Sequence, residues 1–221
     1  MRARSTDAGR AEAAPPGCAV TPAGVVDLRG GAGRAELRYP AGDLVIVSGL
    51  PGSGKSTLIR RAVPALDGRG GLVWCVDSQD SRERLERRTP RWLPYGAYRP
   101  VVRAVHYAAL RRALRSGASA VVHDCGERSW VRRWAVRAAR RRGGGAHLVV
   151  LDVPVGTALA GQWARGRLVS AWAFRRHRRG VGRLVAAGRL PPGMRSMVLV
   201  DRAAADALRG IAFGPSTPAG G

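Results

Sequence analysis

A short run of glycine, serine and lysine near position 50 has the composition of a phosphate-binding loop. Residues 49–56 read Gly-Leu-Pro-Gly-Ser-Gly-Lys-Ser and fit the pattern G-x-x-x-x-G-K-[ST]. Glycines let consecutive backbone N–H groups point toward one anion, and a following helix N-terminus adds unpaired donors. Lys55 can reach the β- and γ-phosphates of a nucleotide, and the Ser56 hydroxyl can ligate Mg²⁺. The loop therefore predicts a site for ATP and Mg²⁺.

The surrounding sequence favours this interpretation over a flexible Gly/Ser linker. An apolar run at 44–47 precedes the loop directly and a helical pattern follows it, which is the context that the motif requires. Lys55 is also the only lysine in a chain that otherwise uses arginine. The predicted nucleotide-binding residues are Gly49, Pro51, Gly52, Ser53, Gly54, Lys55, Ser56 and Thr57.

Five apolar runs locate the elements that must position this loop. They alternate with segments of helical spacing and predict strands at 44–47, 72–76, 120–124, 147–152 and 197–200. Because the runs are apolar throughout, we expect a mostly parallel five-stranded sheet with helices on both faces. This is the α/β fold of P-loop NTPases, here with an Arg-rich helical lid.

Two further segments have their own local signals. Residues 34–39 alternate polar and apolar side chains and predict a strand that turns at 40–43 into a hairpin with the 44–47 strand. This would add an N-terminal edge strand to the sheet. Residues 89–100 contain three prolines and predict a loop, and the helical spacing of 101–115 predicts a helix.

The ends of the chain differ in composition from its middle. Residues 1–33 are rich in Ala, Gly, Pro and Arg without periodicity, and 214–221 are similar, so we expect both segments to be disordered. Residues 34–213 then form one ATP-binding domain. The 221 residues, 45% hydrophobic, suffice for a substantial core.

Arginine gives the chain a strongly basic character. It has 38 Lys and Arg against 15 Asp and Glu, a net charge of +23, and a pI near 11.8. Such a balance favours nucleic acid or another polyanion as partner. The arginines are spread along the chain, however, so genome composition and solvated helix faces explain them equally well.

Cysteine, histidine and hydropathy patterns limit the other classes of function. Cys18, Cys75 and Cys125 have no C-x-x-C spacing and predict buried thiols in a reducing compartment. The four histidines do not cluster with cysteines, so no zinc site is expected. The apolar runs are too short for a membrane span and the N-terminus lacks a secretory h-region. We therefore expect a cytoplasmic protein that does not bind membranes.

Acidic residues follow three of the predicted strands, where parallel α/β sheets bind their ligands. Asp124 ends its strand and could hold Mg²⁺ or orient a phosphate acceptor. Asp152 ends another strand, but the turn into a helix at Pro154 favours a capping role there. Asp77 and Asp80 could orient or deprotonate an acceptor hydroxyl, or equally cap a helix, and Arg82 could hold a phosphate.

Arginine-rich segments in the second half suggest a lid. Arg165 and Arg167 flank Gly166 where a predicted helix ends, and an arginine there could close over the transferring phosphate. A solvated Arg-rich turn is an equal alternative. The arginine runs at 140–142 and 175–179 are more typical of solvated faces than of phosphate-backbone contacts.

The chain resembles P-loop kinases of the group that includes polynucleotide 5′-hydroxyl kinases and zeta-toxin-like kinases, with an AAA_33-type ATP-binding domain. The resemblance runs from about Leu44 to Arg179. It rests on the segments SGLPGSGKSTLIRR, DSQDSR, VVHDCGE and LDVPVGTALAGQWARGR. The first is specific to nucleotide binding and the last is fairly specific to this kinase group.

The resemblance implies roles for particular side chains. Lys55 would contact phosphates, Arg165 would be the lid arginine, and Arg82 would hold a phosphate of the substrate. With Asp80 added from its position after the second strand, the predicted catalytic residues are Lys55, Asp80, Asp124 and Arg165. The predicted metal ligands are Ser56 and Asp124, and the predicted substrate contacts are Asp77 and Arg82.

One position departs from the family pattern. These kinases have D-D-x-R, with the first Asp as general base, and alignment on Asp80 and Arg82 puts Gln79 at that position. Gln cannot accept the proton, although Asp77 or Asp80 could replace it. The expected function is transfer of the ATP γ-phosphate to a hydroxyl of a nucleic acid end, nucleotide or small molecule. The alternatives are an ATP-binding switch with little turnover and a basic nucleic-acid-binding protein.

Overall fold

The computed structural model describes residues 19–31, 34–90, 92–93, 95–124, 129–166 and 169–215. Its strands are β1 (Ala19–Val20), β2 (Gly24–Asp27), β3 (Glu36–Pro40), β4 (Leu44–Gly49), β5 (Trp74–Val76), β6 (Ala120–Asp124), β7 (Ala146–Leu151), β8 (Ser196–Val200) and β9 (Gly210–Gly214). Its helices are α1 (Lys55–Ala62), α2 (Ser78–Glu86), α3 (Tyr95–Arg115), α4 (Ser129–Arg141), α5 (Val155–Trp163), α6 (Ala171–Ala187) and α7 (Arg202–Ala207). None of the helices in these ranges is long and apolar enough to cross a membrane.

The strands form two parallel sheets. The larger has six strands in the order β2-β8-β7-β4-β6-β5, and the smaller has the order β1-β3-β9. Strand β4, which leads into the phosphate loop, is central and pairs with β6 and β7 over its whole length. The carboxyl ends of β4, β6 and β7 therefore meet at one edge, beside the start of α1.

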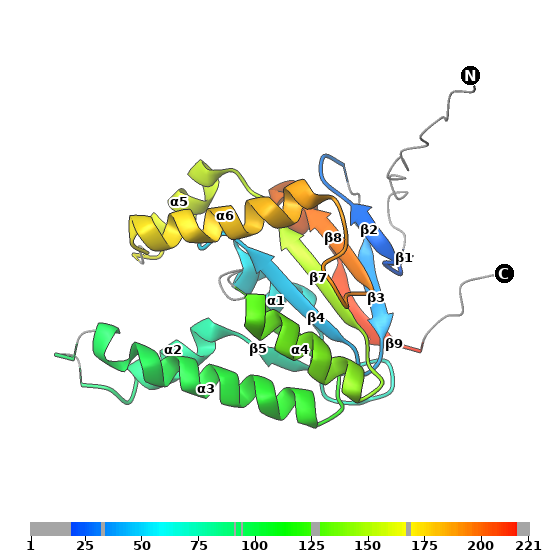
Figure 1. Cartoon of the computed structure of the whole chain (residues 1–221), viewed down its shortest axis with the longest axis horizontal. Helices are drawn as coiled ribbons and strands as arrows, with labels where there is room; N and C mark the ends of the chain where they lie inside the picture. The colour runs from blue at the N-terminus through cyan, green and yellow to red at the C-terminus, as the bar shows by residue number, and fades with distance from the viewer. Residues whose placement is uncertain are drawn as a thin grey trace, which may run out of the picture.

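The two faces of the larger sheet are covered by different layers. Leu44 and Ile46 of β4 pack in a cluster with residues of α3, α4 and α6, whereas Val45 and Val47 pack with α1, α7 and the smaller sheet. This alternation follows from the opposite directions of successive side chains in a strand. In Figure 1, α5 and α6 lie at the top of the molecule, and α2, α3 and α4 lie at the bottom. The prediction of a parallel sheet with helices on both faces is confirmed.

The predicted hairpin at 34–47 is wrong. Strand β3 pairs in parallel with β1 and β9 in the smaller sheet and does not pair with β4. Both edges of β4 are already occupied by β6 and β7, so no edge is left for a hairpin partner. Leu37 and Tyr39 are buried instead against the second face of the larger sheet.

Part of the N-terminal segment is ordered, contrary to the predicted disorder of residues 1–33. Residues 24–27 form β2, the additional edge strand, which pairs in parallel with β8. Val25 and Val26 pack against the two core clusters, a contribution that the Gly-rich composition of the segment concealed. Residues 1–18, 32–33 and 216–221 lie outside the described residues, so the rest of the predicted disorder is untested.

Two local predictions also need correction. Helix α3 begins at Tyr95 and includes Pro100, so it begins six residues earlier than the predicted 101. Pro100 is the sixth residue of the helix and lacks the N–H that would donate to the Gly96 carbonyl oxygen. Cys75 is exposed on the edge strand β5, where alternate side chains face solvent, and its thiol is free. Cys18 and Cys125 lie outside the described residues.

Candidate functional site

The phosphate loop turns sharply between β4 and α1. Gly52 and Gly54 have φ values of 85° and 96°, which side-chain-bearing residues rarely adopt. Gly54 is the N-cap of α1, and the first turn of that helix has no acidic residue. The positive end of the helix dipole is therefore not neutralised within the helix, and the loop amides and α1 together suit an anion.

Lys55 holds this loop closed. Its side chain is buried, and Nζ donates hydrogen bonds to the carbonyl oxygens of Gly49 at 2.9 Å and Leu50 at 2.7 Å. The Ser53 Oγ lies 3.4 Å away. The ammonium group is thus positioned at the loop by neutral oxygens, which a phosphate could replace as stronger partners.

Helix α5 packs directly on the phosphate loop. A Cβ on Gly52 would lie 2.0 Å from the Ala158 carbonyl oxygen, and one on Gly161 would lie 2.3 Å from the Gly52 oxygen. Gln162 is buried and bridges the two elements, because its amide donates to Pro51 O and accepts from the Val169 N–H. The sequence segment that follows β7 therefore packs against the phosphate loop, in addition to carrying Arg165.

A cavity of about 340 Å³ opens beside the loop. It extends from the P-loop toward α3, α4 and α6 and mixes polar with apolar walls. Its lining includes Pro51, Gly52, Gly54, Lys55, Ser56, Ser78, Gln79, Arg82, Val102, Arg103, His106, Tyr107, Leu110, His123, Asp124, Val131, Arg132, Arg165, Val169 and His177.

Asp124 is the carboxylate of this lining. It lies opposite Ser48 in the β4–β6 register, so it projects from the strand end next to the loop. Its Oδ2 is buried without a hydrogen-bond partner and lies 3.9 Å from Nη1 of Arg132. An unbonded carboxylate oxygen in the same cavity as the Ser56 hydroxyl fits the oxygen ligands that Mg²⁺ takes.

No group of three or more His, Cys, Asp or Glu side chains in the described residues could hold a metal by itself. This agrees with the usual way in which Mg²⁺ is bound at nucleotide sites, through one or two protein oxygens and the substrate phosphates. Ser56 and Asp124 are thus suited to an ion that arrives with a nucleotide.

Asp77 lies behind the loop and not in the cavity wall. Its carboxylate is hydrogen-bonded to the Ser56 side chain and to the Gln79 N–H, and its Oδ1 is 2.7 Å from His123 Nδ1. Burial by itself would raise the pKa of Asp77, but the His123, Ser56 and Gln79 contacts outweigh it and hold that pKa well below the ordinary value. Asp77 therefore supports Ser56 and caps α2.

The other α2 candidates have separate surroundings. Asp80 is not among the lining residues, and burial followed by the charge of Asp77 raises its pKa. Gln79 lines the cavity, and its amide donates to Glu83 Oε1 at 2.8 Å. Arg82 also lines the cavity while its Nε contacts Glu86 at 2.6 Å. The predicted substrate contacts were Asp77 and Arg82, and of these two Arg82 lines the cavity whereas Asp77 does not.

Arg165, the predicted lid arginine, lies beside the loop. It follows α5, lines the cavity, and its Nη2 donates to Thr57 Oγ1 at 3.3 Å. The side chain is otherwise exposed. Arg167 lies outside the described residues.

Asp152 is not a turn cap, contrary to the prediction. Its Oδ2 lies 2.6 Å from Nη1 of Arg29, which also binds Asp27. The N-cap of α5 is Pro154, which has no side-chain cap. Because the N-terminal strand was predicted to be disordered, this ion pair could not be foreseen.

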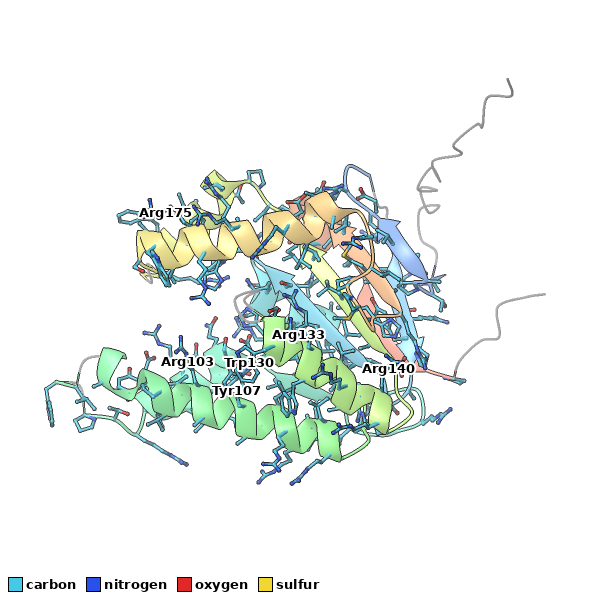
Figure 2. The ribbon with its side chains drawn as sticks, in the orientation of Figure 1. Arg103, Tyr107, Trp130, Arg133, Arg140 and Arg175 are labelled. Carbon is cyan, nitrogen blue, oxygen red and sulfur yellow. The ribbon has the colours of Figure 1, made fainter. Side chains whose placement is uncertain are left out.

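The α3 wall of the cavity was missed from the sequence. Arg103, His106, Tyr107 and Leu110 follow the spacing of one helical face, a signal that could have identified them. Figure 2 shows Arg103 and Tyr107, from the middle of α3, near Trp130 at the start of α4. The Tyr107 and Trp130 ring centroids are 6.1 Å apart.

The run 140–142 is only partly solvated. Arg140 and Arg141 are exposed, but Arg142 is half-buried and its Nη1 donates to Ala118 O at 2.9 Å. Burial lowers the pKa of Arg142 from its ordinary value. This arginine ties α4 to the loop before β6.

A parallel sheet with this loop, this buried lysine and this strand-end carboxylate defines a P-loop nucleotide-binding domain. Residues 44–181 match the model of the AAA_33 family, an AAA domain. The chain belongs to that family. No protein among curated sequences matches it.

The fold also occurs in a solved structure. A protein of the PezAT chromosomal toxin–antitoxin system of Streptococcus pneumoniae aligns with a TM-score of 0.53 at 12% identity, over 81% of this chain and 80% of its own. A candidate kinase from Chloroflexus aurantiacus aligns with a TM-score of 0.48 at 16% identity, over 72% and 84%. The APS kinase CysC of Mycobacterium tuberculosis, solved with AMPPNP and APS, gives a TM-score of 0.36 at 17% identity, over 73% and 90%.

Proposed function

We propose that this chain is an ATP-dependent phosphotransferase that transfers the γ-phosphate to a hydroxyl group. The observation that carries the proposal is the shared cavity: Lys55 and Ser56 of the loop, Asp124 of β6 and Arg165 of the lid all line it. The cavity also continues past these groups toward α3 and α4, and this part of it is where we place the acceptor.

In the proposed reaction, the acceptor oxygen bonds to the γ-phosphorus, and the bond from phosphorus to the bridging oxygen breaks. The acceptor hydroxyl gives its proton late to an oxygen of the transferred phosphoryl group, from which it passes to solvent, and ADP leaves. Ser56 and Asp124 would hold Mg²⁺, which neutralises phosphate charge when bound. The loop amides, Lys55 and Arg165 stabilise charge on the transferring group. Asp124 also orients the acceptor hydroxyl. Since the transition state is loose, a strong base at the position of Gln79 is not essential.

A nucleotide-dependent switch with little turnover is the second candidate. It is favoured by Gln79, which lines the cavity where the related kinases have an acid and which has its amide bound to Glu83. Neither Asp77 nor Asp80 lines the cavity in its place. In this case ATP would bind tightly and ADP would form slowly whatever acceptor is present.

Acceptor-stimulated ADP release separates the two functions. The chain is incubated with γ-labelled ATP and a panel of RNA and DNA 5′ ends, nucleosides, sugars and antibiotics. A kinase labels an acceptor and releases ADP faster in its presence, and Asp124→Asn lowers that rate at least about tenfold. Tight ATP binding with no acceptor-dependent turnover in any arm would reject the kinase in favour of the switch.

A further inference from the structure

Helix α6 has two unlike faces. Phe174, His177 and Val181 are buried, and the first and last belong to the core cluster under the helix. The opposite side carries one exposed surface, here called the α6 ridge, formed by Trp172, Arg175, Arg176, Arg179 and Arg183. Figure 2 shows Arg175 on α6 at the top of the molecule, opposite the α3–α4 side that carries Arg103 and Trp130.

The ridge is a concentrated positive charge. Helix α6 has five arginines and no Asp or Glu. Within the described part of the chain, no ion pair to a carboxylate joins Arg175, Arg176, Arg179 or Arg183.

An aromatic ring stands at one end of this charge. Trp172 is 61% exposed, and the Arg176 guanidinium lies 5.4 Å from its ring centroid. Arg175, Arg179 and Arg183 are four residues apart, so successive guanidinium stems are about 6 Å apart along one side of the helix. A row of cations beside an exposed ring is the combination that binds the backbone and a stacked base of a single strand.

We propose that the α6 ridge binds single-stranded nucleic acid, through phosphate contacts of its arginines and stacking of a base on Trp172. A lipid surface is a poorer partner, because insertion requires an apolar helix face and that face of α6 is buried in the core. The ridge does not line the nucleotide cavity, so this binding is separate from the proposed phosphotransfer.

Fluorescence anisotropy with a labelled 12-nucleotide RNA or DNA strand tests the proposal. The variant Arg175→Gln/Arg179→Gln/Arg183→Gln should bind at least about tenfold more weakly at 0.1 M salt and reduce the salt slope by about 2. Trp172→Ala should weaken binding about fivefold or more. The control Arg111→Gln/Arg112→Gln/Arg115→Gln removes the same charge from exposed positions of α3 and should change affinity by less than about twofold.

Several outcomes would overturn the proposal. The first two are an equal loss of strand affinity in both triple variants and no strand binding by the wild-type chain. The other two are tighter binding of a duplex of equal length and binding of phosphatidylserine vesicles but not of the strand. Circular dichroism checks that each variant is folded. Lys55→Ala should retain strand binding, so a failure of the proposed phosphotransfer is distinguishable from a failure of this proposal.

Discussion

At the scale of single residues, glycine does two different things in the phosphate loop. Gly54 supplies the left-handed N-cap of α1, and Gly52 both adopts a positive φ and lets α5 approach. The sequence motif predicts the unusual backbone conformation of these glycines but not the approach of α5 to Gly52. This approach depends on Ala158 and Gly161, more than 100 positions later in the chain, because it is a packing contact.

Replacement of Gly52 by Ala tests that contact. The new Cβ would lie 2.0 Å from the Ala158 carbonyl oxygen and 2.9 Å from Gln162 Cγ. We expect Gly52→Ala to lower the free energy of unfolding by about 2–4 kcal/mol and to weaken ATP binding. Gly70→Ala is the matched control, because Gly70 has a φ of 77° with open space around it. Denaturant titration should show that Gly70→Ala lowers the free energy of unfolding by about 1 kcal/mol. An equal decrease in both variants would refute the packing role of Gly52.

Asp77, behind the phosphate loop, could be identified from the sequence as a candidate residue, but its contacts could not. Asp77, as the first polar residue after a strand, was identified as either a substrate contact or a helix cap. Its contacts with Ser56 and His123 join three elements, and sequence spacing does not show which strands are neighbours. The position of Asp124 at the edge that carries the loop was predictable, since it ends a strand of a parallel sheet and such sheets bind ligands at the carboxyl ends of their strands.

At the scale of elements, the end of α5 and the segment after it are tied to the phosphate loop and to α1. Gln162 bonds to Pro51 and Val169, and Arg165 bonds to Thr57. Under the proposed function, Arg165 would act as the lid arginine from this position on the first turn of α1.

Arg165→Ala should reduce kcat at least about tenfold, because the proposed role of this arginine is to stabilise the transition state. The free energy of unfolding should change by less than about 0.5 kcal/mol, because the side chain is exposed. The measurement is steady-state ADP release together with thermal unfolding. Arg137→Ala, an exposed arginine of α4 outside the cavity lining, is the control and should keep full activity. Unchanged kcat in Arg165→Ala would remove this arginine from the reaction.

The amino-terminal edge of the sheet has a buried polar network of its own. Asp43, 2% exposed, accepts from the Gly145 N–H at 2.5 Å, and its Oδ2 lies 2.9 Å from His147 Nε2. His147 Nδ1 lies 2.8 Å from Ser196 Oγ, which links the network to β8. Burial raises the pKa of Asp43, but the bonds from His147 and Gly145 and the charge of Arg195 lower it below its ordinary value.

The pKa of Asp43 is lower in the folded state than the value of about 3.8 in the unfolded state. The ionised Asp43 carboxylate therefore adds to the free energy of unfolding above pH 3.8, and this stabilisation is lost as the pH falls through the lower, folded-state pKa. Asp43→Asn should therefore cost about 1–3 kcal/mol at pH 7, and the difference from wild type should shrink below pH 4. Urea unfolding between pH 3 and 7 measures this. A difference that is constant over that range would contradict the assigned pKa direction.

At the scale of the whole molecule, the core of the fold was predictable and its edges were not. The five strands β4 to β8 and the helices between them follow from continuous apolar runs, because strands in the interior of a sheet covered on both faces must be apolar throughout. Strands β1, β2, β3 and β9 depend on which sheet edges remain open, and that is decided by the assembled sheet. The α3 wall of the cavity was missed because helical spacing groups its residues on one face of α3 but does not show that this face borders the cavity.

The central claim is that the loop before α1 binds the phosphates of ATP through Lys55. Calorimetric titration of Mg²⁺-ATP into wild type, Lys55→Ala and Arg60→Ala tests it directly. Arg60 is an exposed residue of the same helix. Lys55→Ala should lose about 2 kcal/mol or more, roughly thirtyfold in Kd, with its circular dichroism spectrum unchanged, while Arg60→Ala binds as wild type does. Wild-type affinity in a folded Lys55→Ala protein would contradict the account.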